Sequence, residues 1–117
     1  MRAPLLPVLL AYAAASLFHH MHNAEFLDHY PNMPAWLSRT GVYGAWLGAT
    51  AVGILGYWLR RRLLLALYAC YGLAVLVHYA IAPVSAHTPM MHLTIVLEAA
   101  TAAALLAATF RTGRTSP

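Results

Sequence analysis

The chain has 117 residues, of which 62% are hydrophobic and only 9% are charged. A soluble domain carries about 25% charged residues, so this chain has too little polar surface to cover itself in water, and the lipid bilayer is its expected surrounding. The net charge of +4 comes from arginine alone, and the arginines lie at the ends of apolar segments instead of forming a stripe that would bind nucleic acid. We therefore expect one membrane domain, residues 1–117, with no nucleic-acid partner and no separate soluble catalytic unit.

Four apolar segments follow one another along the chain, at about residues 4–26, 41–59, 63–82 and 88–110. Each is close to the ~20 residues that cross a hydrocarbon core of ~30 Å as a helix. Their apolar residues are continuous and do not alternate with polar ones, which favours helices over strands. We therefore predict an all-α integral membrane protein, a four-helix bundle whose helices contact lipid.

A cleaved signal peptide is the competing interpretation of the first segment. Arg2, the apolar run after it and the small residues up to Ser16 loosely resemble such a signal, which would remove residues 1–15. The apolar character continues past the small residues, and this favours a membrane helix. The histidines that follow would stay on the same side of the membrane in either case.

The placement of arginine predicts the orientation of the four segments. In a four-span topology, Arg2, the turn 60–62 and the arginines of residues 111–114 share one side, and only Arg39, in the long loop 27–40, lies opposite. Positively charged residues favour the cytoplasmic side. We therefore expect both termini inside (N-in/C-in), the loop outside, and a multi-pass protein of a bacterial inner membrane or plasma membrane.

Every histidine lies at the outer end of a predicted segment. Four end the first segment or follow it, one lies near the end of the third, and two open the fourth: His19, His20, His22, His29, His78, His87 and His92. Imidazole, thioether and carboxylate groups are the ligands that proteins use for transition metals, and helical bundles build metal sites from inward side chains on facing helices. The pattern therefore indicates an outward-facing polar site.

Six polar side chains of this end are the candidate metal ligands: His19, His22, Glu25, His78, His87 and His92. His22 and Glu25 are three residues apart and share a helix face, a spacing that di-iron bundles use in the reverse order. Methionines follow the histidines and add soft ligands that suit copper, with zinc and iron as the other candidates. His20 and His29 are expected to be bystanders. A hydrated rim without metal is the competing interpretation of any single histidine.

Glu98 is the acidic residue that lies deepest in a predicted span. It lies about ten residues into the fourth segment, or ~15 Å along a helix, which is near the middle of the bilayer. Met91, Thr94 and Glu98 share a helix face, because they are separated by three and four residues. A carboxyl group at that depth is costly without a partner, so we expect it to face a histidine, tyrosine, threonine or bound cation inside the bundle.

The stretch His22-Asn23-Ala24-Glu25-Phe26, followed by Pro34-Ala35-Trp36, resembles the HXXEE-domain family of small integral membrane proteins. His22 and Glu25 match the first two positions of the His-x-x-Glu-Glu motif of that family, whereas Phe26 stands where the second glutamate would be. The resemblance covers about fifteen residues. It implies a membrane protein with a polar His/Glu site and selects no substrate or reaction.

Three other functions fit the same sequence. Two histidines on facing helices would ligate haem b. Glu98 with histidines above it would serve a small ion-transporting or proton-transporting subunit. Gly44 and Gly48 form a Gly-x-x-x-Gly pair, which permits close helix contact and would suit a homo-oligomer or an accessory or assembly subunit of a larger membrane complex. No phosphate-binding loop or nucleophile elbow occurs, and whether the protein is an enzyme stays open.

Overall fold

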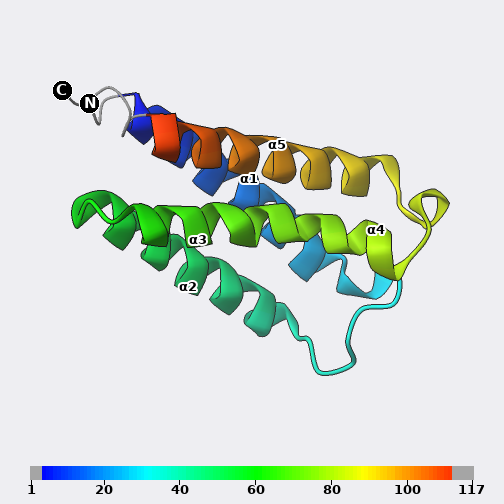
Figure 1. Cartoon of the computed structure of the whole chain (residues 1–117). Helices are drawn as coiled ribbons and strands as arrows, with labels where there is room; N and C mark the ends of the chain where they lie inside the picture. Colours follow the sequence, from blue (N-terminus) through cyan, green and yellow to red (C-terminus); the bar gives the residue numbers. More distant parts are fainter. Residues whose placement is uncertain (1–3, 112–117) are drawn as a thin grey trace.

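The computed structural model describes residues 4–111 (Figure 1). The predicted orientation depends in part on Arg2 and Arg114, and both lie outside the described residues. Within the described range the chain forms α-helices and short 3-10 turns, without any β-strand. The α-helices are α1 (Leu5–Glu25), α2 (Arg39–Trp58), α3 (Arg62–Leu73), α4 (His78–Ile81) and α5 (Pro89–Arg111), and the 3-10 turns are η1 (Leu27–His29), η2 (Ala74–Val77) and η3 (Val84–Ala86).

Helices α3 and α4 belong to one rod. α3, η2 and α4 follow one another without a break over 20 residues, and we call this element the α3–α4 rod (Arg62–Ile81). The described chain is therefore a bundle of four helical rods, as predicted, and their ends lie within a few residues of those expected. α1 and the α3–α4 rod lie diagonally, because each of them packs against both α2 and α5.

The bundle has two chemically different ends (Figure 1). We call the end with the loop 26–38 and the turn 82–88 the histidine end, and the end with the turn 59–61 and Arg111 the arginine end. Ser38 caps the start of α2 at the histidine end, where its hydroxyl accepts a hydrogen bond from a backbone N–H of the first turn at 3.0 Å. At the arginine end, Arg60 adopts a left-handed φ of 58°, which allows the short turn into the next rod.

The buried core has two apolar parts. One lies toward the arginine end and consists of Leu5, Leu9, Tyr12, Leu65, Tyr68, Ala69, Ala102 and Leu105. The other lies at the histidine end and consists of Tyr30, Val75, Met91 and Ile95. The bundle also buries His19, His20, His78, Thr94 and Glu98. Many large apolar side chains, such as Leu10, Leu47, Leu67 and Val96, are exposed on the outside of the rods, which suits contact with lipid.

Glycine allows the closest contacts between rods. Gly53 of α2 lies against the ring of Tyr68, and Gly72 of the α3–α4 rod lies against the ring of Tyr12. A Cβ atom at either glycine would overlap the facing ring. The two tyrosine rings pack on each other with their centroids 4.5 Å apart, so α1, α2 and the α3–α4 rod interlock at this level.

The predicted contact pair Gly44 and Gly48 faces open space. A Cβ atom at either position would meet no described atom within 4 Å, leaving aside α2's own adjacent turns. The pair therefore makes no close contact with another rod of the chain, and this face of α2 is open to lipid or to another chain.

Three of the rods are long and apolar enough to cross a membrane: Leu5–Glu25, Arg62–Ile81 and Pro89–Arg111. α2 has 20 residues but is not among them. Its glycine, tyrosine and tryptophan residues lower its mean hydropathy although its length is sufficient. We predicted four spans, so the crossing by α2 and the N-in/C-in orientation stay predictions.

Candidate functional site

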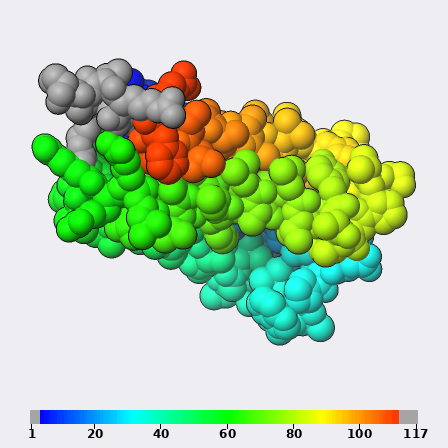
Figure 2. Space-filling view, viewed as in Figure 1, coloured from blue at the N-terminus to red at the C-terminus, as the bar shows by residue number. Residues whose placement is uncertain are grey.

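A pocket of about 190 Å³ lies between α1, the start of α2, the α3–α4 rod and α5. Its polar lining consists of His19, His20, Asn23, Tyr71, His78 and Glu98, and its apolar lining consists of Met33, Leu37, Val42, Ala45, Ala74, Val75 and Val77. Figure 2 shows a hollow on this side, between the α3–α4 rod (green) and the loop 26–38 with the start of α2 (cyan to teal), where α1 (blue) is visible. The loop 26–38 supplies two of the lining residues and so covers part of the pocket.

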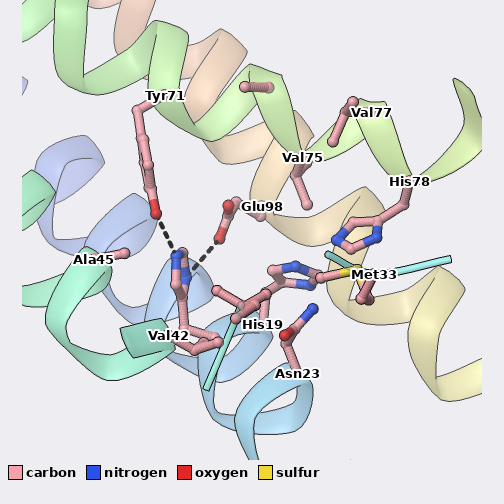
Figure 3. A pocket seen from close by; sticks show the side chains of 13 residues that line it. His19, Asn23, Met33, Val42, Ala45, Tyr71, Val75, Val77, His78 and Glu98 are labelled. Atoms are coloured by element: carbon pink, nitrogen blue, oxygen red, sulfur yellow. Dashed lines mark hydrogen bonds and ion pairs between the residues drawn. The ribbon is translucent and has the colours of Figure 1, made fainter. Parts of the chain in front are cut away.

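Glu98 and His20 form a buried pair at the deep end of the pocket. Oε2 of Glu98 lies 3.6 Å from Nδ1 of His20, and both side chains are almost completely enclosed. The same Nδ1 lies 2.7 Å from the backbone oxygen of Ser16, which only accepts hydrogen bonds, so Nδ1 carries a hydrogen. On the other side of the ring, Nε2 lies 2.7 Å from the hydroxyl oxygen of Tyr71 (Figure 3). Ser16 and Tyr71 thus fix the orientation of His20 beside the carboxylate.

His19 and His78 approach each other in the part of the pocket nearer the histidine end, with ring centroids 5.3 Å apart (Figure 3). Nδ1 of His19 lies 3.1 Å from Oγ1 of Thr94, and Thr94 donates its own hydrogen to the backbone oxygen of Met91 at 3.1 Å. Thr94 therefore accepts from His19, which places the hydrogen of the neutral ring on Nδ1 and leaves a lone pair on Nε2. Metal-binding histidines are commonly oriented by such a hydrogen bond through the other ring nitrogen.

Two residues of the loop, Tyr30 and Met33, lie next to these rings, and Met33 also lines the pocket. The ring of Tyr30 packs against His78 and His19 with centroid separations of 5.3 Å and 6.2 Å. Burial raises the pKa of Tyr30 to about 12, so its hydroxyl stays protonated and donates to Nδ1 of His22 at 2.7 Å. Figure 3 shows the thioether of Met33 beside the rings of His19 and His78. The loop thus adds a soft sulfur atom to the same space.

Several buried polar atoms of the described chain have no hydrogen-bond partner: Asn23 Oδ1, His78 Nδ1, His87 Nε2 and Glu98 Oε2. Three of them belong to residues that line the pocket. Each such atom costs about 1–3 kcal/mol when it stays unpaired, and native proteins seldom leave such atoms unpaired. The pocket is therefore suited to a polar or cationic occupant.

A second pair of histidines lies between the pocket and the surface of the histidine end. His87 precedes α5 and is only 6% exposed, and its Nδ1 donates to the backbone oxygen of Pro83 at 2.9 Å. The His87 ring lies 6.4 Å from that of His78 and 5.8 Å from that of His92, measured between centroids. Nδ1 of His92 lies 2.6 Å from the hydroxyl of Tyr79. We call His87 and His92 the rim pair.

Four of the six predicted ligands do not line the pocket: the rim pair lies beside it, and Glu25 and His22 make other contacts. Glu25 is exposed at the end of α1, where its carboxylate accepts hydrogen bonds from Nε of Arg39 at 2.8 Å and from the hydroxyl of Tyr43 at 2.6 Å. His22 is half-buried, bonds to Tyr30 and does not line the pocket. The face shared by His22 and Glu25 therefore contacts the loop and the start of α2.

His20 is the candidate that sequence reasoning missed. We expected a bystander, but its side chain is buried and lines the pocket beside Glu98. A signal was present in the sequence, because Tyr12, Ser16 and His20 follow one another at intervals of four and so place polar groups on one face of an apolar helix. His29, the other expected bystander, is exposed and lies outside the pocket lining.

The arrangement brings the predicted histidines together in two pairs. His19 and His78 meet in the pocket, and His87 and His92 form the rim pair beside it. Among residues 4–111, no group of three His, Cys, Asp or Glu side chains is arranged to hold a metal ion. The pocket offers instead two imidazoles with the thioether of Met33, and an imidazole–carboxylate pair at its deep end.

Comparisons of this chain with protein-family models, with curated proteins and with solved structures gave no match.

Proposed function

We propose that the chain is a multi-pass membrane protein that binds one transition-metal ion in this pocket, with copper as the first candidate and zinc and iron as alternatives. One observation carries the proposal: Asn23 Oδ1, His78 Nδ1 and Glu98 Oε2 are buried without hydrogen-bond partners in residues that line a single pocket. In this proposal α2 also crosses the bilayer, and the histidine end faces outward.

The size of the pocket supports a small occupant. Pockets for organic ligands have about 300–1,000 Å³, whereas this pocket has about 190 Å³. At roughly 30 Å³ per water molecule, the space suits an ion with a few waters. His19 and His78 are already in contact, with ring centroids 5.3 Å apart, which leaves no room for a tetrapyrrole between them. Haem b is therefore the weaker alternative.

The donor atoms of the pocket suit a soft cation. Nε2 of His19 keeps a lone pair, Nδ1 of His78 has no partner, and the thioether of Met33 lies beside both rings. Thioether ligands select copper(I), and imidazole also binds copper, zinc and iron. The carboxylate of Glu98 would offset the positive charge of the ion in a low-dielectric interior. Binding needs rotation of these side chains toward one point, since the described residues show no ready group of three ligands.

The double variant His19→Ala/His78→Ala is expected to lose copper binding, because it removes both imidazoles that face each other in the pocket. The measurement is anaerobic titration of the detergent-purified protein with Cu⁺ against a chromophoric Cu⁺ chelator. The matched control is His22→Ala/His29→Ala, which removes two histidines of the same end that do not line the pocket. The control should bind copper like the wild type.

Loss of copper in the control, with binding retained in His19→Ala/His78→Ala, would contradict the pocket assignment. Because the double variant removes buried side chains, Met33→Leu serves as a second variant that preserves the shape of the pocket. It should weaken copper binding about tenfold or more, since it removes one ligand without opening a cavity. An unchanged dissociation constant in both pocket variants would overturn the proposal.

A further inference from the structure

The pocket and the rim pair form a continuous series of imidazoles. From the surface inward, the ring centroids are separated by 5.8 Å between His92 and His87, by 6.4 Å between His87 and His78, and by 5.3 Å between His78 and His19. His92 is half-buried, whereas the other three are buried. The series therefore begins at the surface of the histidine end and ends inside the pocket.

The lateral mouth of the pocket is unsuited to a cation. The exposed lining residues Ala45, Ala74 and Val77 are apolar, and the exposed Tyr71 directs its hydroxyl inward to His20. The hollow in Figure 2 lies along the sides of the rods, where lipid would surround a membrane-spanning bundle. A metal ion that entered there would lose its hydration without gaining a ligand, which is strongly unfavourable.

The rim pair has the free nitrogen atom that an entering ion needs. Nδ1 of His87 donates to the backbone oxygen of Pro83, so its Nε2 keeps a lone pair, and this buried Nε2 has no partner. The Tyr79 ring contacts both members of the pair, stacking on His92 at 5.6 Å and meeting His87 at 5.1 Å between centroids. Both imidazoles are thus held in place before any ion arrives.

We infer that the rim pair is the entry site for the metal ion. A cation from the medium at the histidine end binds first at His87 and His92 and then passes to His78 and His19 in the pocket. Each transfer exchanges one imidazole for the next without a fully unliganded intermediate. This inference rests on the proposed function, because it needs an ion that binds in the pocket.

An entry site changes the rate of binding more than its equilibrium. We expect His87→Ala/His92→Ala to take up Cu⁺ from a chromophoric chelator roughly tenfold more slowly than the wild type in stopped-flow experiments. The stoichiometry should be unchanged, and the dissociation constant should stay within about threefold, because the pocket ligands are intact. His29→Ala is the control and should bind at the wild-type rate, since this exposed histidine lies outside the series.

Because His87 also holds the turn before α5 through Pro83, His92→Gln is measured beside the double variant. It removes one imidazole at a half-buried position and should also slow uptake. Unchanged rates in both variants would overturn the entry site while leaving the proposed function standing. Loss of stoichiometric copper in the rim variants would also overturn it, because the pair would then belong to the final site. A wild-type protein that binds no metal would remove both proposals.

Discussion

Gly53→Ala is expected to destabilise the protein by about 3 kcal/mol, because the new methyl group would overlap the ring of Tyr68. That ring has little freedom to move: it packs on Tyr12 with centroids 4.5 Å apart, and its hydroxyl lies 3.3 Å from Oγ1 of Thr50. The rods must therefore separate or the tyrosine must leave its place. Thermal unfolding in detergent, followed by circular dichroism, measures the loss as a lower Tm.

Gly48→Ala is the matched control on the same helix. A Cβ atom there meets nothing within 4 Å outside the local turns of α2, so no clash arises. Alanine favours a helix over glycine by about 1 kcal/mol, so Tm should stay the same or rise slightly. A control that lost as much stability as Gly53→Ala would contradict the packing described here. The oligomeric state of the control should be measured as well, because Gly44 and Gly48 lie on the open face of α2.

Glu98→Met is expected to make the metal-free protein more stable and to weaken its metal binding. Glu98 is 1% exposed, and its Oε2 has no hydrogen-bond partner. Replacing it with an apolar side chain of similar shape removes the cost of burying that oxygen, about 1–3 kcal/mol. His20 keeps its contacts with the backbone of Ser16 and with Tyr71, so both of its ring nitrogens stay paired. A gain in stability with a loss of binding is typical of functional residues.

The control for this prediction is Glu25→Met, the same change at an exposed carboxylate. Glu25 pairs with Arg39 at the surface, so its replacement recovers no burial cost and should give no rise in Tm. Thermal unfolding of both variants without metal, followed by copper titration, provides the comparison. A lower Tm for Glu98→Met would contradict this prediction, because it would show that the carboxylate stabilises the fold.

The rods could be predicted from the sequence because their apolar runs are long and continuous. Leu5–Glu25 and Pro89–Arg111 lie within a few residues of the predicted segments 4–26 and 88–110. The clustering of histidines at one end followed from the same segments, since their order along the chain determines which residues reach the same end. The inward placement of Glu98 was also predictable, because Met91, Thr94 and Glu98 recur at helical spacing and all three are buried.

The convergence of particular side chains could not be predicted, because the rotation of each rod depends on packing. His20 and His22 are two residues apart and so point about 200° apart around α1, and the sequence does not say which of them faces the core. Packing turned His20 inward and left His22 on Tyr30. Glu25 pairs with Arg39, which lies on the other side of the loop in the sequence, and no local sequence pattern predicts this ion pair.

The contacts of α2 could not be predicted from its sequence pattern either. Gly44 and Gly48 have the spacing of a contact pair, yet Gly53 packs closely on Tyr68 of the α3–α4 rod, because the position of that ring decides where a glycine is needed. The same glycines lower the hydropathy of α2, although it packs between two rods that are long and apolar enough to span a membrane. The composition of α2 alone therefore does not identify it as a membrane span, whereas its packing places it beside two helices that are long and apolar enough to be spans.

The metal content of the wild-type protein decides whether the pocket binds a transition-metal ion. The protein is purified in detergent, reloaded in turn with Cu⁺ without oxygen, with Zn²⁺ and with Fe²⁺, freed of excess ion and analysed by mass spectrometry. We expect one tightly held ion per chain, with copper retained best, because the pocket is small and the Met33 thioether lies beside His19 and His78. A chain that retains none of the three ions after reloading would contradict metal binding in the pocket.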